Sequence, residues 1–291
     1  MNKNAMSDTR PSPIAGTWYS ANPAQLRQEL EGYLNEAIPP SFDGQLKALI
    51  LPHAGHFYSG LTAAHALKAI TGQDYQRVII ISPSHQAYPG HVLTSQHDAY
   101  QTPFGLVPVD HSSLDKLSAF LEKEAVQVNH IRRDREHAIE IELPFLQLLL
   151  PDDFQLIPLM LMDQSLSLAK TLSDGLVKLI SSYPSDEKTL LIASSDLSHF
   201  YHQRTANRLD HNLIEGLQNF EPEKFYQLKS AHKAEACGHG AMATVLLTAK
   251  KMGANQVTIA DYRTSGDISG DFSSVVGYVS AIISTGVSDL S

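Results

Sequence analysis

The chain has 291 residues, of which 22 are Lys or Arg and 31 are Asp or Glu, so its formal net charge is −9. With 43% hydrophobic and 18% charged residues, the composition is typical of a globular protein and excludes a disordered chain. The acidic balance argues against a nucleic-acid or anionic-membrane partner, and no apolar run approaches the ~18 residues of a membrane span. The single cysteine, Cys237, cannot form an internal disulfide, and the polar first residues lack the apolar stretch of a signal peptide. These features predict a cytoplasmic protein.

Strands and helices are expected to alternate along most of the chain. Residues 1–13 are expected to be a loose tail, and residues 14–291 a single α/β domain. The first helix begins at Pro23, with Asn22 as its cap and Leu26 and Leu30 on its apolar face. There follow, in chain order, a strand at 46–51, a helix at 60–70, a strand at 77–82, short strands at 91–94 and 105–109, a helix after Asp110, a strand at 154–162, a helix at 166–180, a strand at 189–193, helices within 203–230 and 238–252, and strands at 257–262 and 275–283. This alternation, with near-continuous apolar strands, predicts a mostly parallel central sheet with helices on both faces.

Histidines follow three of the strongest predicted strands. The sequences are PHAGH at 52–56, SPSH at 82–85 and SSDLSH at 194–199. Because ligands bind beyond the carboxyl ends of strands in open α/β sheets, we expect these side chains to line one site. The alternative is that each is an ordinary loop histidine.

Cys237 stands just before a predicted helix, where the helix dipole favours a thiolate. Two neutral imidazoles and one thiolate would provide three ligands for Zn(II), Fe(II) or copper, leaving an open position. The alternative is a buried cysteine that acts as a small apolar side chain.

Two further segments carry candidate site residues. Asp196 and His199 are spaced so that the carboxylate could orient the imidazole as a general base or hold a metal-bound water. Alternatively, Asp196 caps a helix that starts near residue 198. A serine hydrolase based on Ser195 is weakly supported, because the Gly-x-Ser-x-Gly elbow is missing.

The segment 135–144 places carboxylates and a histidine among apolar residues. If it is helical, His137 and Glu140 share one face and could orient a metal-bound histidine; the alternative is a half-exposed acidic face. Pro144 predicts a kink or a new helix start.

The chain resembles the Memo family through seven motifs that recur in the same order. They are WY at 18–19, PHAG at 52–55, Y-x-G at 58–60, SPSH at 82–85, EHAIEIELPF at 136–145, SSDLSH at 194–199 and CGHGA at 237–241. The resemblance implies the single-domain α/β fold of the class III extradiol dioxygenases, which cleave aromatic rings with non-haem Fe(II).

The same resemblance implies the roles of individual residues. The metal ligands are expected to be His53, His85 and Cys237, with Asp196 and His199 lining the pocket and His199 in the place of the dioxygenases' general base. The dioxygenases use a carboxylate as their third ligand, whereas a cysteine also accepts copper or zinc, so ring cleavage is not implied. Other residues placed in or around the pocket are His137, Glu140, His56, His239, Trp18 and Tyr58.

We therefore expect a metal-binding protein whose catalytic status the sequence leaves open. The first hypothesis is a mononuclear oxidoreductase that uses one Fe(II), or copper, on an unidentified small molecule. The alternatives are a Zn-dependent hydrolase or transferase, and a non-catalytic module that binds a peptide or metabolite or sequesters metal. The resemblance also suggests a radical-SAM protein as a pathway partner.

Overall fold

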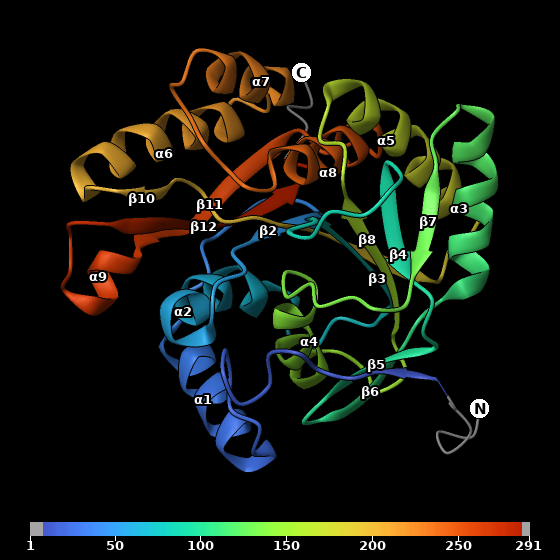
Figure 1. Ribbon diagram of the computed structural model, residues 1–291, viewed down its shortest axis with the longest axis horizontal. Coiled ribbons are helices and arrows are strands. Elements are labelled where there is room, and N and C mark those ends of the chain that lie inside the picture. The colour runs from blue at the N-terminus through green and yellow to red at the C-terminus, as the bar shows by residue number, and fades with distance from the viewer. Residues whose placement is uncertain (1–7, 287–291) are drawn as a thin grey trace.

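The computed structural model describes residues 8–286, which form a central nine-stranded sheet with helices on both faces (Figure 1). The strand order is β10-β12-β2-β9-β3-β8-β4-β7, with β11 beside β12. The strands are β2 (Leu46–Leu51), β3 (Tyr75–Pro83), β4 (Val92–Ser95), β7 (Val128–Ile131), β8 (Gln155–Leu161), β9 (Lys188–Ser194), β10 (His199–Tyr201), β11 (Gln256–Thr264) and β12 (Val275–Ser284).

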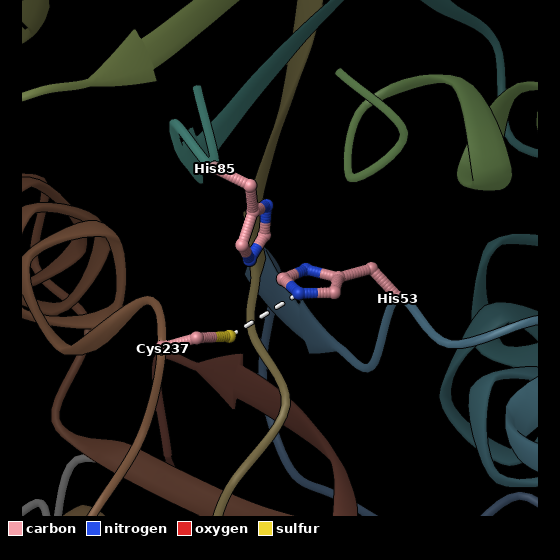
Figure 2. A group of neighbouring side chains, drawn as sticks. All are labelled: His53, His85 and Cys237. Atoms are coloured by element: carbon pink, nitrogen blue, oxygen red, sulfur yellow. Dashed lines mark hydrogen bonds between the residues drawn. The ribbon is translucent and has the colours of Figure 1, made fainter. Parts of the chain in front are cut away.

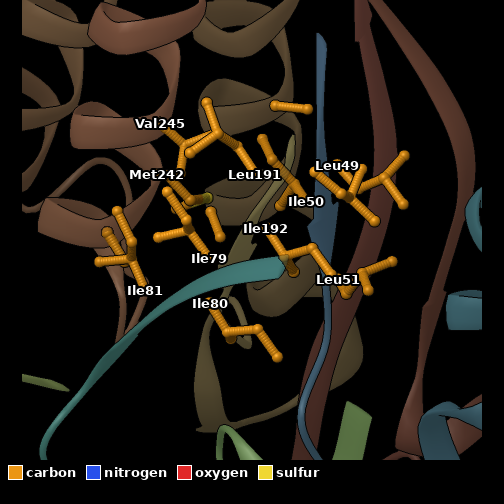
Figure 3. Packing of buried hydrophobic residues seen from close by; sticks show 14 of the residues in the cluster. Leu49, Ile50, Leu51, Ile79, Ile80, Ile81, Leu191, Ile192, Met242 and Val245 are labelled. Carbon is orange, nitrogen blue, oxygen red and sulfur yellow. The ribbon is translucent and has the colours of Figure 1, made fainter. Parts of the chain in front are cut away.

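The four central strands β2, β9, β3 and β8 are parallel to one another, as the sequence predicted. Consecutive residues such as Ile79, Ile80 and Ile81 are fully buried, because helices cover both faces of these strands (Figure 3). The flanks differ from the prediction. On one side β12 is antiparallel to β2, β10 and β11, and on the other β4 is antiparallel to β8. The sheet is therefore mixed, with a parallel centre.

The helices lie in two layers, with α1, α2 and α4 on one side of the sheet and α5, α7 and α8 on the other (Figure 1). Two predicted helix starts are wrong. The helix expected from residue 60 begins at His56, and no helix begins near residue 198, where β10 forms and α6 starts only at Gln203. A new helix does start beside Pro144, at Leu143. The helices are α1 (Pro23–Glu36), α2 (His56–Leu67), α3 (His111–Lys123), α4 (Leu143–Leu149), α5 (Leu166–Ser181), α6 (Gln203–Gln218), α7 (Pro222–Ser230), α8 (His239–Lys251) and α9 (Ser265–Ser269), with 3-10 turns at Lys68–Ile70 and Glu140–Glu142. Within residues 8–286, no helix combines the length and the apolar character that crossing a membrane requires.

The predicted loose tail is wrong for its second half; residues 1–7 lie outside the described part of the chain. The strand β1 (Thr9–Arg10) pairs with β5 (Ala99–Thr102), which also pairs with β6 (Gly105–Pro108). Arg10 is buried, with its guanidinium bonded to Asp134 at 2.6 Å and to Glu140 at 2.5 Å. It also lies 4.6 Å from the centre of the Tyr100 ring. These contacts fix a polar segment that local sequence alone would leave free.

Candidate metal centre

Three side chains converge where the central strands end. His53 follows β2, His85 follows β3, and Cys237 lies two residues before the start of α8 (Figure 2). One ligand atom from each lies within 4.8 Å of the other two, and the Cys237 sulfur is 3.2 Å from His53 Nε2. The structure thus brings together three residues that are up to 184 positions apart in the sequence.

Hydrogen bonds orient both imidazoles so that Nε2 points into this cluster. The Ser194 hydroxyl donates to the carbonyl of Ala138, so it accepts from His53 Nδ1 at 2.9 Å. His85 Nδ1 donates to Glu136 Oε1 at 2.9 Å. With Nδ1 carrying the proton in both rings, each Nε2 keeps a lone pair for a metal ion.

The backbone around Cys237 requires a glycine at the next position. A Cβ on Gly238 would lie 2.7 Å from the carbonyl oxygen of Ser194 and 2.8 Å from the Ser195 side chain. The Gly238 N–H also donates to Ser195 Oγ at 2.9 Å, and the Cys237 N–H to the Asp196 carbonyl at 3.2 Å. This close packing against the end of β9 places the sulfur beside the histidines.

The electrostatics of Cys237 differ from the prediction made from its place at a helix N-terminus. The helix does begin at His239, but burial and the nearby Asp196 carboxylate raise the pKa of the Cys237 thiol. The Asp196 N–H, which donates to the sulfur at 3.2 Å, lowers this pKa but does not outweigh burial. A bound cation is the group that would stabilise the thiolate here.

The pKa values of the two histidines shift in opposite directions. Burial, with the neighbouring imidazoles of His137 and His85, lowers the pKa of His53 well below its usual value, which keeps it neutral. Burial also acts to lower the pKa of His85, but the hydrogen bond to Glu136 and the charges of Glu136 and Asp196 together outweigh burial and raise it. For Glu136, burial is likewise outweighed by His85, and its pKa falls to about 2. Two imidazole nitrogens and one sulfur around a shared point suit a borderline-soft metal ion, so the residues present fit a bound metal.

Asp196 holds the backbone of the candidate ligand His53. Its Oδ1 accepts from the backbone N–H of His53 at 2.8 Å, and burial raises the pKa of the carboxyl to about 7. It does not cap a helix, because β10 follows it. The carboxyl of Glu142 is also buried there, and burial together with the Asp196 charge raises its pKa well above the usual value.

A cavity of about 600 Å³ opens beside the cluster. His85 and Cys237 form part of its wall, as does the candidate base His199, whereas Asp196 is not among the lining residues. The rest of the wall consists of Tyr201, Leu209, Lys229, His232, Ala234, Glu235 and Ala236. This volume suits a small organic molecule.

Of the segment 135–144, His137 lies beside the cluster but Glu140 does not. The His137 ring stacks on His85, with ring centres 4.6 Å apart, and burial lowers the pKa of His137 to about 4. Glu140 bonds instead to Arg10 and Tyr19, so the carboxylate that orients a metal-site histidine is Glu136.

A second group, His85, Glu136 and His137, also brings candidate ligand atoms within 4.8 Å. Glu136 Oε1, however, already accepts from His85 Nδ1 and from the N–H groups of His137 and Ala138, at 2.9, 3.0 and 3.1 Å. We therefore assign these residues to holding His85 rather than to a separate metal site.

The remaining predicted residues divide between the cluster and other places. The Trp18 ring lies 4.3 Å from the His137 ring, beside the cluster. His56 faces away, since its Nε2 bonds to the Ile141 carbonyl. Tyr58 packs on Phe57 at the surface, and His239 lies behind the cavity wall, within 3.2 Å of Lys229.

Sequence reasoning missed Glu136 and Ser194, the two partners that orient the histidines. Both belong to motifs that were singled out, EHAIEIELPF and SSDLSH. Their position in those motifs was the available signal. Sequence could not show that Glu136 pairs with His85, because the two residues are 51 positions apart in the chain.

Comparison with known proteins covers nearly the whole chain. A family model described as Memo-like protein matches residues 10–282. A MEMO1 family protein of Nitrosopumilus maritimus is 33% identical over 269 residues, which is 91% of this chain and 96% of that protein. The MEMO1 family proteins of Sulfolobus acidocaldarius and Thermotoga maritima are each 34% identical, over 92% and 94% of this chain and 96% and 99% of their own. Among solved structures, an uncharacterized Escherichia coli K12 protein matches 82% of this chain and 100% of its own, with 14% identity and a TM-score of 0.49.

Proposed function

The chain belongs to the Memo-like protein family, and from this premise we propose that it is a mononuclear metal oxidoreductase that acts on a small molecule in the cavity. The metal ion is held by His53 Nε2, His85 Nε2 and the Cys237 sulfur. Fe(II) is the proposed metal, with copper as the alternative among redox-active ions. When bound, the metal supplies redox chemistry and an open coordination position for substrate.

One observation carries this proposal: both histidines are oriented by hydrogen bonds at Nδ1 so that their Nε2 atoms face a sulfur, beside a cavity. In the metal-free state the Cys237 thiol donates a hydrogen bond to His53 Nε2, and a bound metal ion would take the place of that shared proton. Three protein ligands with an adjacent cavity are typical of catalytic rather than structural metal sites.

Four other residues take part in the proposed function without binding the metal. His199 lines the cavity next to His85 and Cys237, where its imidazole can accept a proton from a bound molecule. Asp196 holds the His53 backbone by accepting its N–H at 2.8 Å. Glu136 and Ser194 accept hydrogen bonds from Nδ1 of His85 and of His53, which fixes the tautomer that leaves each Nε2 free to bind the metal.

The test is an anaerobic titration of the metal-free protein with Fe(II), compared with Cys237→Ser and His199→Gln. We expect Cys237→Ser to bind Fe(II) at least about a hundredfold more weakly while its circular dichroism is unchanged. His199→Gln, which removes no ligand, should bind Fe(II) as the wild type does but should turn over oxidisable substrates more slowly. Equal Fe(II) affinity in Cys237→Ser would refute the metal centre.

A second candidate is a Zn-dependent hydrolase, which the sulfur ligand favours because thiolates bind Zn(II) well. In that case His199 would activate a metal-bound water. Protein purified from its native host would then contain zinc and no redox-active metal. Metallated protein that turns over neither class of substrate would point to a binding or metal-sequestering role.

A further inference from the structure

Lys229, near the end of α7, stands in the wall of the same cavity as the metal ligands His85 and Cys237. Its ammonium nitrogen lies 3.1 Å from Nε2 and 3.2 Å from Nδ1 of His239. His239 is itself anchored, because it is buried and its Nδ1 lies 3.3 Å from the Ala236 carbonyl. The lysine is thus held at a defined place by an imidazole in the first turn of α8.

The positive charge of Lys229 has no carboxylate partner within ion-pair distance among residues 8–286. An imidazole that accepts a hydrogen bond carries no negative charge, so His239 positions the ammonium without neutralising it. Glu235, the carboxylate in the cavity wall, accepts a hydrogen bond from the Tyr201 hydroxyl at 2.9 Å. Burial accordingly lowers the pKa of Lys229, and the more distant Glu235 offsets this only in part.

The cavity wall therefore carries three different kinds of group. It contains the candidate metal ligands His85 and Cys237, the ammonium group of Lys229, and the apolar side chains of Leu209, Ala234 and Ala236. A molecule that satisfies all three has an anionic group, an apolar body and a group that reaches the metal.

We propose that Lys229 binds the carboxylate of an organic acid whose other end faces the metal centre. Only one part of this inference rests on the proposed function, namely that the other end of the acid faces a metal ion. A carboxylate suits the site better than a phosphate, because a single ammonium matches one negative charge and Glu235 in the same wall repels a second. Lys229 is thereby a specificity-determining residue, which selects acids over neutral molecules of the same shape.

The experiment is calorimetric titration with benzoate, benzamide and inorganic phosphate, using wild type, Lys229→Gln and the matched control Lys233→Gln. Lys233 lies four residues further along the chain and, like Lys229, is exposed, but it does not line the cavity. Each titration is done on metal-free and Co(II)-loaded protein, and Co(II) affinity is measured separately from its sulfur charge-transfer absorption.

We expect benzoate to bind wild type and Lys233→Gln equally and Lys229→Gln about fivefold more weakly, the effect of losing one partly exposed charge pair. Benzamide should bind weakly and equally to all three proteins, and Co(II) affinity should not change. Benzoate that binds Lys229→Gln as well as wild type, or does not bind wild type at all, would overturn the inference.

Tighter binding of phosphate than of benzoate, with the same dependence on Lys229, would overturn the assignment to a carboxylate. Failure of the proposed function looks different: Co(II) would then bind without a sulfur absorption band in all three proteins. The Lys229-dependence of benzoate binding to metal-free protein would still decide whether Lys229 is an acid-binding residue.

Discussion

Replacing Glu136 by Gln should weaken metal binding without removing a ligand. Glu136 accepts from donors on both of its oxygens: Oε2 bonds to the His85 backbone N–H at 2.6 Å, and Oε1 to His85 Nδ1 at 2.9 Å. Oε1 also accepts from the N–H groups of His137 and Ala138. Whichever way a glutamine amide is turned, its NH₂ group faces at least one of these donors.

The size of the effect follows from these contacts. Glu136 is buried, so a donor left without a partner costs about 2 kcal/mol of folding stability. The His85 ring loses the charged acceptor that holds Nδ1–H, and loss of such a partner weakens metal binding about tenfold or more, which is about 1.4 kcal/mol.

The assay is anaerobic titration with Co(II), followed through the sulfur-to-metal absorption of Cys237, together with urea unfolding of the metal-free protein. Glu235→Gln is the matched control, because Glu235 lines the same cavity but bonds to Tyr201 rather than to a ligand. We expect wild-type Co(II) affinity in the control and a loss of about tenfold in Glu136→Gln. Equal affinities in the two variants would refute the argument that Glu136 orients His85.

Three further predictions test other parts of the site. Burial raises the pKa of Asp196 from 3.8 to about 7, so the native state binds a proton that the unfolded state has lost, and the stability of the metal-free protein should fall by about 3 kcal/mol between pH 5 and pH 8. Urea unfolding should show this loss in wild type and not in Asp196→Asn; parallel curves for the two would contradict it. Gly238→Ala should lower stability by about 2 kcal/mol and weaken metal binding, because its Cβ would lie 2.7 Å from the Ser194 carbonyl oxygen. Gly32→Ala, in α1 with open space around its Cβ, should instead raise stability by about 0.7 kcal/mol, so thermal melts that shift alike in both variants would argue against a tight fit at Gly238. Ser194→Ala removes the acceptor of His53 Nδ1–H and should reduce Co(II) affinity about tenfold, and unchanged affinity would show that His53 does not need that partner.

Local sequence was sufficient for the parallel centre of the sheet and for the chemistry of its strand ends. Apolar β-branched runs such as that around Ile79–Ile81 are buried on both faces, and this pattern is visible without any partner. His53 and His85 directly follow such runs, so their shared edge could be predicted from the rule that parallel strands end together. Cys237 joined the group on ligand chemistry, as a thiolate beside two imidazoles, and the resemblance to the Memo family then implied the same three residues; spacing alone did not group them.

Only the tertiary structure decided which groups surround these residues. Arg10 was expected in a loose tail, yet it is buried against Asp134 and Glu140, 124 and 130 positions away. Those contacts occupy Glu140 and leave Glu136 to hold His85. The antiparallel flanks of the sheet and the place of Lys229 beside the cavity likewise depend on contacts between distant segments. Periodicity and capping report the environment of a residue along its own strand or helix, whereas hydrogen bonds and ion pairs between distant segments are selected by the packing of the whole chain, so the partners of the candidate ligands appear only once the chain is folded.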